Sequence, residues 1–179
     1  LRDQALEEAA KLGQKMPDDA SYLYGIPYNL KDLFITKDIR TTAGSKILYN
    51  YVPAYDGYVS KNLKKSGAIL VGKTSCDEFG MGSTNENSAY GAVTNPLNPE
   101  FVPGGSSGAT AVSIAEGSSF FGMGTDTGGS SRLPANFCGI VGFKPTYGRV
   151  SRFGQIAYAS SLDQASPMAR TSLDLSLIH

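Results

Sequence analysis

This sequence almost lacks histidine and has no tryptophan. Of its 179 residues, only the last, His179, is a histidine. Histidine is the usual base that takes the proton of a nucleophilic serine, and this chain can offer it only at that end. A serine hydrolase built on this sequence would therefore need a base of another residue type.

Cysteine, net charge and long apolar runs are also scarce. The two cysteines, Cys76 and Cys138, fit no metal-like or paired spacing, which favours a reduced cytoplasmic setting over a disulfide framework. Lys+Arg 16 against Asp+Glu 16 gives a net charge of zero, so bulk charge does not draw the chain to nucleic acid. No signal peptide opens the sequence, and its apolar stretches fall short of the roughly 20 residues that span a bilayer. We expect a cytoplasmic protein without membrane contact.

Glycine is abundant and gathers around two serines. Residues 104–108 read Gly-Gly-Ser-Ser-Gly and residues 124–130 read Gly-Thr-Asp-Thr-Gly-Gly-Ser. Such density of glycine indicates close approach of the backbone to another group. Ser130 is the candidate nucleophile, and Lys31 is the candidate base because burial lowers the pKa of a lysine. A structural interpretation also remains, since a Gly-Gly-Ser run is most often a turn and a lysine beside an aspartate is most often a solvated pair.

The remaining parts of an acyl-transfer site can be assigned around these two residues. Ser106 would pass a proton from Ser130 to Lys31, because a hydroxyl both donates and accepts hydrogen bonds. Negative charge on the attacked carbonyl oxygen would be received by backbone N–H groups at a helix entrance. The candidates for this oxyanion hole are Thr127, Gly128, Gly129 and Ser130.

Two other glycine patterns imitate nucleotide-binding motifs. Residues 67–74, Gly-Ala-Ile-Leu-Val-Gly-Lys-Thr, satisfy the Walker A pattern letter for letter. A phosphate loop follows a strand and is flexible, whereas here a strand-like Ala-Ile-Leu-Val occupies the place of the loop. Residues 122–124 begin a dinucleotide fingerprint, but Thr127 stands where its third glycine belongs. Neither pattern is a strong indication of a nucleotide site.

Apolar periodicity predicts alternating helices and strands, and hence an α/β sheet in a single domain over residues 1–179. Both serine runs would then lie at strand or helix ends, where the sites of α/β sheets gather, and the polar loops 82–88 and 95–99 would form walls or lids. Leu1 replaces an initiator methionine and no stop signal follows residue 172, so we expect an N-terminal fragment of a longer domain. The predicted helices are 2–12, 58–65, 107–115, one from about Ser131 and one over 172–179; the predicted strands are 28–35, 68–71, 119–123 and 140–143.

Four motifs together resemble the amidase signature family. They are residues 25–32, 103–108, 124–130 and 138–146, and the resemblance extends from Leu23 to Arg170. It implies one α/β domain with a mixed sheet covered by helices, and amide hydrolysis by a Lys–Ser–Ser triad through an acyl-enzyme on serine. Carried over by motif, Lys31 is the base, Ser106 is the bridging serine with a cis peptide bond to its neighbour, and Ser130 is the nucleophile.

Within that family, four further segments resemble the A subunits of tRNA-dependent amidotransferases. They are residues 77–83, 86–91, 144–154 and 160–164. The resemblance implies that this subunit hydrolyses glutamine and supplies the ammonia that converts Glu-tRNA(Gln) to Gln-tRNA(Gln). It also implies a B subunit that uses ATP and Mg²⁺ and handles the tRNA, a small C subunit, and no cofactor or metal in the hydrolytic subunit itself.

Departures from the family pattern leave alternatives open. Ala109 stands where the family usually repeats glycine, and residues 42–45 and 131–133 also differ from the usual motifs. None of these changes removes a triad residue. A stand-alone amidase acting on another small amide is the alternative within the class, and a non-catalytic module that only docks partners is the alternative outside it. Whether the aminoacyl-tRNA carries glutamate or aspartate is left open, as are the oligomeric state and independent folding of these residues.

Overall fold

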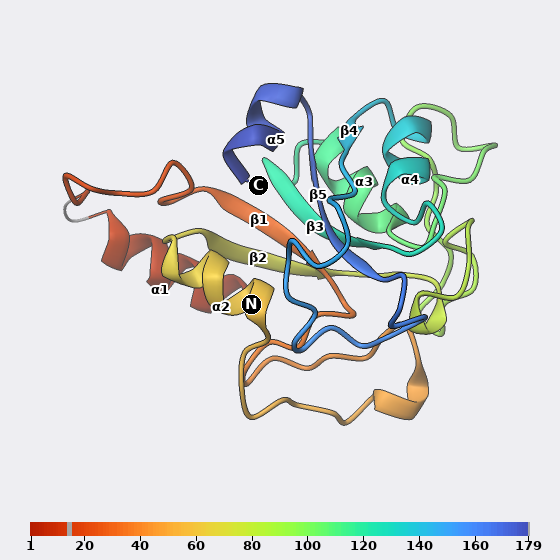
Figure 1. Cartoon of the computed structure of the whole chain (residues 1–179), viewed down its shortest axis with the longest axis horizontal. Helices are drawn as coiled ribbons and strands as arrows, with labels where there is room; N and C mark the ends of the chain where they lie inside the picture. Colours follow the sequence, from red (N-terminus) through yellow and green to blue (C-terminus); the bar gives the residue numbers. More distant parts are fainter. Residues whose placement is uncertain (14–15, 179) are drawn as a thin grey trace.

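The computed structural model of the chain describes residues 1–13 and 16–178 and has a mixed β-sheet at its centre (Figure 1). Within the described residues the sheet has five strands in the order β2-β1-β3-β5-β4. Strand β1 runs parallel to β2 and β3, whereas β5 runs antiparallel to β3 and β4. The predicted α/β class and mixed sheet are therefore confirmed. The strands are β1 Pro27–Lys31, β2 Ile69–Thr74, β3 Phe121–Asp126, β4 Val141–Gly142 and β5 Gln164–Ala169.

Helices cover both faces of this sheet. Side chains of α2 and α5 join one apolar core with β1 and β3, and side chains of α3 and α4 join a second core with β5. In Figure 1, α3 and α4 accordingly lie together, away from α2. The helices are α1 Arg2–Leu12, α2 Tyr58–Lys65, α3 Gly108–Ala115, α4 Arg132–Phe137 and α5 Ser172–Ile178, with short 3-10 turns η1 Lys46–Leu48 and η2 Glu78–Gly80.

Alternation along β3 separates the two faces. Phe121 and Met123 pack in the first core, while Gly122 and Gly124 turn towards α3 and α4. A Cβ on Gly122 would lie 2.6 Å from Thr110 Cγ2, and one on Gly124 would lie 2.5 Å from the Ser131 hydroxyl oxygen. These two glycines therefore let α3 and the entrance of α4 approach the strand closely.

Most predicted elements are confirmed, with shifted boundaries. The predicted strand over 28–35 is wrong beyond Lys31, because the chain turns there and the Phe34 N–H donates to the Lys31 carbonyl at 3.0 Å. Strand β3 starts later than predicted and continues to Asp126, and β2 continues to Thr74. Strand β5 was not predicted. The C-terminal helix is present to Ile178, and its predicted last residue lies outside the described part of the chain.

The Walker A look-alike is part of the sheet. Most of residues 67–74 form β2, and the Lys73 amine lies 3.0 Å from Asp32 Oδ1 and donates to the Phe34 carbonyl and the Thr41 hydroxyl. A lysine engaged in this way is a structural element of the sheet edge. The structure therefore has a strand where a phosphate loop would have to lie, as the sequence indicated.

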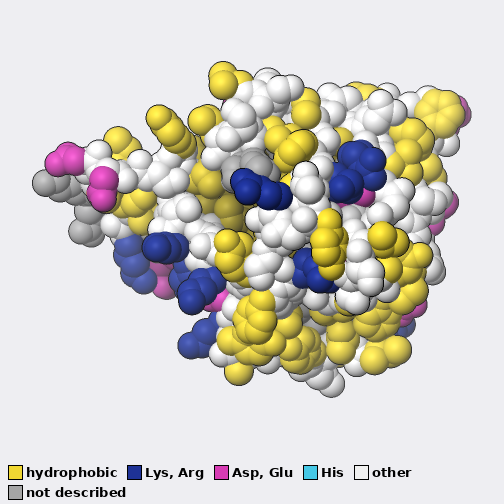
Figure 2. All heavy atoms as spheres, in the orientation of Figure 1, with side chains coloured by type: hydrophobic (Ala, Val, Ile, Leu, Met, Phe, Trp, Pro, Cys, Tyr) yellow, Lys and Arg dark blue, Asp and Glu magenta, His cyan; other side chains and the backbone are white. Residues whose placement is uncertain are grey.

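Hydrophobic side chains also lie on the surface. Figure 2 shows them gathered at the bottom of the view, where the segment between β1 and α2 lies in Figure 1. Ile47, Tyr49, Val52 and Tyr55 of this segment are exposed. None of the helices in the described ranges has the length and apolar composition needed to cross a membrane.

Candidate active site

Lys31 is the centre of the candidate site. It is the last residue of β1 and is fully buried. Its amine nitrogen, Nζ, donates to three hydroxyl oxygens: Ser106 Oγ at 2.7 Å, Ser107 Oγ at 2.9 Å and Thr125 Oγ1 at 2.7 Å. Within the described residues no carboxylate lies within 4.0 Å of this amine. The lysine is thus held by neutral groups only.

Burial gives this lysine an unusual acidity. Desolvation, the largest cause, lowers the pKa of Lys31 to about 8, and smaller opposing contributions come from the buried Asp77, Asp126 and Asp163. A lysine with a pKa near 8 has a substantial neutral fraction close to physiological pH. The amine is therefore able to act as a base without histidine.

The three hydroxyls are not equivalent as proton donors to Lys31. An ammonium donates three hydrogen bonds, whereas the neutral amine donates two and must accept one. The Ser107 hydroxyl donates to the Thr125 carbonyl at 3.2 Å, so its proton is already engaged. Only Ser106 and Thr125 are left to return a proton to the amine. The bridging assignment of Ser106 agrees with this arrangement.

Ser106 and Ser107 belong to the first glycine-serine run and directly precede α3. The peptide bond between Gly105 and Ser106 is cis, as the family resemblance predicted, and Ser106 is fully buried. The Ser107 N–H donates to the Ser130 carbonyl at 3.0 Å. The two glycine-serine runs, distant in sequence, therefore meet beside Lys31.

Ser130 lies in the turn between β3 and α4. It is half-buried, and its hydroxyl has no hydrogen-bond partner among the described residues. The structure thus joins Lys31 to Ser106 by a direct hydrogen bond, and brings Ser130 to this pair through its backbone. The Ser130 hydroxyl remains available to a substrate.

The turn that carries Ser130 is shaped by Asp126. This carboxylate accepts hydrogen bonds from the N–H groups of Gly129 at 2.9 Å, Ser131 at 3.2 Å and Arg132 at 3.2 Å, and from the Arg132 guanidinium at 2.9 and 3.0 Å. Burial raises the pKa of Asp126, but the hydrogen bonds from Arg132 and Ser131 outweigh it and hold the pKa below its usual value. The carboxylate therefore anchors both the turn and the start of α4.

The N–H groups predicted for an oxyanion hole differ in their surroundings. The Gly129 N–H is engaged by Asp126, whereas the N–H groups of Gly128 and Ser130 have no acceptor in the described part of the chain. The Thr127 hydroxyl donates to Asp163 Oδ1 at 2.6 Å, which fixes the start of the turn. Among the four predicted N–H groups, those of Thr127, Gly128 and Ser130 are thus unengaged within the described residues.

A polar loop forms one wall of the site, as predicted for residues 82–88. A Cβ placed on Gly105 would lie 2.8 Å from the backbone nitrogens of Thr84 and Asn85, so the loop lies directly against the first serine run. A Cβ placed on Gly80 would lie 3.6 Å from the Ser106 hydroxyl oxygen. The other predicted wall, residues 95–99, instead packs near the end of α4, where Asn95 Nδ2 donates to the Phe137 carbonyl at 3.0 Å.

Several residues at this site were not identified from the sequence. Ser107 and Thr125 bind the Lys31 amine, and Asp126 and Asp163 hold the turn. Three of the four lie inside or next to the glycine-serine runs, so the runs themselves were the available signal. Asp163 lay in a segment noted only for its family resemblance.

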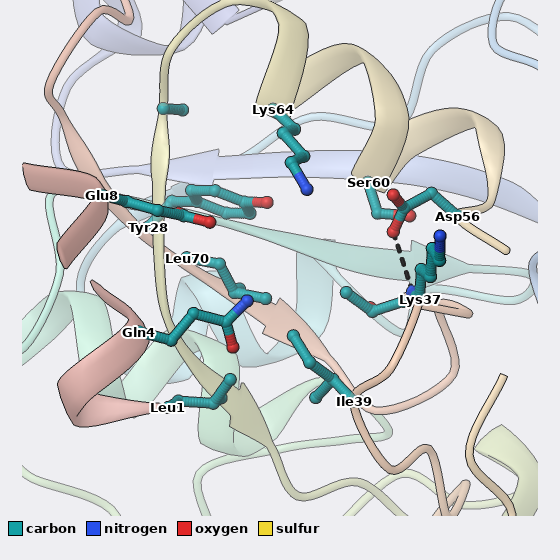
Figure 3. Close-up of a pocket in the computed structure, with 12 residues that line it drawn as sticks. Leu1, Gln4, Glu8, Tyr28, Lys37, Ile39, Asp56, Ser60, Lys64 and Leu70 are labelled. Atoms are coloured by element: carbon teal, nitrogen blue, oxygen red, sulfur yellow. Dashed lines mark hydrogen bonds between the residues drawn. The ribbon is translucent and has the colours of Figure 1, made fainter. Parts of the chain in front are cut away.

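Five hollows in the described part of the chain are lined by none of the three triad candidates. Figure 3 shows one between α1, α2 and β2, where the Lys37 N–H donates to Asp56 Oδ1 at 2.8 Å; its volume is about 30 Å³. That is room for about one water molecule. Within the described ranges, no group of three or more His, Cys, Asp or Glu side chains is arranged to hold a metal ion.

Comparison with curated proteins shows close relatives. The A subunit of glutamyl-tRNA(Gln) amidotransferase from Maridesulfovibrio salexigens is 55% identical over 172 residues, which cover 96% of this chain and 35% of the relative. The protein of the same name from Marinomonas sp. is 57% identical over 171 residues, which cover 95% of this chain and 35% of the relative. The chain thus spans about a third of the length of these relatives.

Solved structures and a family model agree with these relatives. A crystal structure of an amidase matches with a TM-score of 0.92 and 39% identity, over 99% of this chain and 41% of that one. The A subunit of glutamyl-tRNA(Gln) amidotransferase from Thermotoga maritima matches with a TM-score of 0.87 and 41% identity, over 99% of this chain and 42% of that one. The model of the family described as Amidase matches residues 1–179. With the fold, the sequence and the predicted cis peptide bond in agreement, the chain belongs to the Amidase family.

Proposed function

We propose that this chain carries the hydrolytic site of a glutamine amidohydrolase, the ammonia-supplying A subunit of a tRNA-dependent amidotransferase. The observation that carries the proposal is the 2.7 Å hydrogen bond from the buried Lys31 amine to the Ser106 hydroxyl, at a lysine whose pKa is about 8. The names of the relatives at 55 and 57% identity support the amidotransferase setting, and glutamine as the substrate is our proposal from the family resemblance.

In the proposed acylation step, Ser130 Oγ forms a bond to the carbon of the glutamine side-chain amide. Its proton passes to Ser106 Oγ, and the Ser106 proton passes to the Lys31 amine. When the C–N bond breaks, the nitrogen takes a proton back from Lys31 through Ser106 and leaves as ammonia. Water then attacks the ester by the same relay, which releases glutamate and restores Ser130.

The oxyanion of each tetrahedral intermediate would be bound by backbone N–H groups of the turn from Thr127 to Ser130. Gly128 and Ser130 offer unengaged N–H groups, whereas Gly129 contributes its N–H only if it releases Asp126. Removing one such donor commonly costs about 3 kcal/mol of barrier. Asp126 and Asp163 anchor this turn and so hold the N–H groups in place, which supports the proposal.

The same proposal covers partners, cofactors and location. The hydrolysis needs only side chains and water, so we propose no cofactor in this subunit, with ATP and Mg²⁺ used by a B subunit that receives the ammonia. A small C subunit would complete the complex, and tRNA would be bound through the partner. A net charge of zero suits a subunit without its own nucleic-acid surface. We place the complex in the cytoplasm.

The test is covalent labelling with a fluorophosphonate, followed by intact-mass measurement, on the protein at its full natural length with its partner subunits. We expect one adduct in the wild type and none in Ser130→Ala or Lys31→Ala. Ser176→Ala, at an exposed serine of α5, should label like the wild type. Glutamine hydrolysis, measured as glutamate release, should be lost in the same two variants.

A stand-alone amidase is a second candidate, because the solved amidase matches with a TM-score of 0.92. A panel of small amides and glutamine, assayed with and without the partner subunits, separates the two. Preferential hydrolysis of another amide without partners would favour this second candidate. The absence of any adduct on a folded protein, with no effect of either variant on assembly, would instead favour the docking module.

A further inference from the structure

Asp77 is a buried carboxylate next to the site that has no part in the proposed triad. It lies at the entrance of η2 and is fully buried. Its Oδ2 accepts from the Asn85 N–H at 3.0 Å and its Oδ1 from the Asn87 N–H at 3.1 Å. No Lys or Arg of the described residues forms an ion pair with it. Two neutral donors alone hold this carboxylate, which leaves its charge unpaired.

The Asp77 carboxylate lies against the serine run that bears Ser106. A Cβ placed on Gly105 would overlap Asp77 Oδ2, so only glycine fits beside the carboxylate. Asn85, which Asp77 holds, accepts a hydrogen bond from the Ala109 N–H at 3.1 Å through its Oδ1. One contact reaches the residue before Ser106 and the other reaches the first turn of α3. Asp77 therefore supports Ser106 from both sides.

The charge of Asp77 also acts on Lys31. Three carboxylates around that amine favour its protonated form: Asp77, Asp126 and Asp163. Burial raises the pKa of the nearby Cys76 thiol to about 12, so this group stays neutral in the pH range in which Lys31 titrates. Asp77 contributes the largest effect of the three carboxylates. Asp126 is paired with Arg132 at 2.9 Å, whereas Asp77 forms no ion pair with a Lys or Arg of the described residues and still acts on the Lys31 amine.

We propose that Asp77 is a positioning residue for the base: it holds Ser106 against the Lys31 amine and supplies the negative charge that favours transfer of the proton to that amine. This inference rests on the proposed function, because it assumes that Lys31 takes the proton of the nucleophile. If the proposal holds, the loop of residues 77–87 contributes to proton transfer as well as forming a wall of the site.

The test is the rate of Ser130 modification by a fluorophosphonate as a function of pH, in the full-length protein with its partners. Asp77→Asn removes the charge and keeps the shape, and Asp77→Glu keeps the charge and alters the shape. The acid limb of the profile is the pH range in which the labelling rate rises as Lys31 loses its proton. We expect Asp77→Asn to move this limb about one pH unit lower, because the neutral amine then persists to lower pH. The plateau rate should fall, because the amine is a weaker base. Asp77→Glu should lose rate and keep the wild-type limb.

A purely structural role would give a different pattern. An unchanged acid limb in Asp77→Asn, or the same displacement in Asp77→Glu, would overturn the proposal. Asp56→Asn is the matched control, because Asp56 also accepts from a backbone N–H but is not among the groups that act on Lys31. If Asp77→Asn does not fold, Asp77→Ser also removes the charge while keeping a hydrogen-bond acceptor. The position of its acid limb then tests the proposal in the same way.

The outcome separates this inference from the proposed function. If Ser130 is labelled and the limb moves as expected, but glutamine is not hydrolysed, the glutaminase proposal fails and the role of Asp77 stands. If glutamine is hydrolysed and the limb does not move, the role of Asp77 fails alone. If the folded wild type is neither labelled nor active, both fail.

Discussion

Two lysines on neighbouring strands, the fully buried Lys31 and the partly buried Lys73, differ in whether a carboxylate is among their partners. Lys31 of β1 is held by three hydroxyls, whereas Lys73 of β2 lies 3.0 Å from the Asp32 carboxylate. Burial lowers the pKa of both. A carboxylate partner favours the ammonium and keeps it charged, but a hydroxyl can reverse its hydrogen bond and give a proton back. A carboxylate among its partners therefore distinguishes the structural lysine, Lys73, from the candidate base, Lys31.

Substitution of Lys31 should have the largest effect on the rate of Ser130 labelling. Lys31→Met removes the base while keeping an unbranched side chain, and we expect the Ser130 labelling rate to fall about 10²- to 10⁴-fold. Circular dichroism and the urea midpoint should stay close to those of the wild type. A variant that keeps its labelling rate would show that the lysine with hydroxyl partners is not the base.

Exchange of Lys73 should act on stability instead. Lys73→Met leaves the Asp32 carboxylate buried without its cation, which costs about 3–5 kcal/mol of unfolding free energy. Urea denaturation measures this loss, and the double variant Asp32→Asn/Lys73→Met should recover part of it. The folded fraction should keep the wild-type acid limb of Ser130 labelling. A changed limb at unchanged stability would contradict the distinction between the two lysines.

The pH dependence sharpens the comparison. The pKa of Lys31 is lowered to about 8, and only its neutral form accepts a proton. The rate of Ser130 labelling should therefore rise about tenfold per unit as the pH increases towards 8, and level off above it. Stopped aliquots analysed by intact mass from about pH 6 to 9.5 measure the profile. A rate that still rises tenfold per unit at pH 9.5, as expected for the value of 10.5 of a solvated lysine, would exclude the buried amine as the base.

Removal of one hydroxyl partner should give the smallest of these effects. Ser107→Ala takes a neutral acceptor from the Lys31 ammonium, and such a bond is worth about 1.5–3 kcal/mol. We expect the acid limb to move about one pH unit lower. Ser113→Ala, which removes a hydroxyl elsewhere on α3, should leave the limb in place. An acid limb at the same pH in Ser107→Ala and Ser113→Ala would mean that Ser107 does not influence the pKa of the base.

The sequence predicted the motif residues better than the contacts between them. Lys31, Ser106 and Ser130 followed from three motifs in order, and Lys31 and Ser106 are in direct contact. Ser107 and Thr125 were missed, because a run of small residues does not reveal which hydroxyl faces the lysine. Their direction depends on how far β3 extends and on how closely α3 approaches it.

Strand β5 was missed for a different reason. Residues 164–169 read Gln-Ala-Ser-Pro-Met-Ala, with a proline and few β-branched or aromatic side chains, so propensity opposes a strand. Pairing with all six residues of β3 and full burial outweigh that preference. Asp77 was noted only as the first residue of a segment with a family resemblance, because its contact with Gly105 depends on a loop that folds back onto the first serine run.

The hydrogen bond from the Ser107 N–H to the Ser130 carbonyl, 3.0 Å long, couples the two halves of the candidate relay mechanically. A thermal displacement of the turn that carries the nucleophile pulls the entrance of α3 with it. The bond therefore opposes motions that would separate the turn of the nucleophile from the entrance of α3. One backbone hydrogen bond thus helps to keep the two parts of the proposed proton path together when the surrounding fold moves.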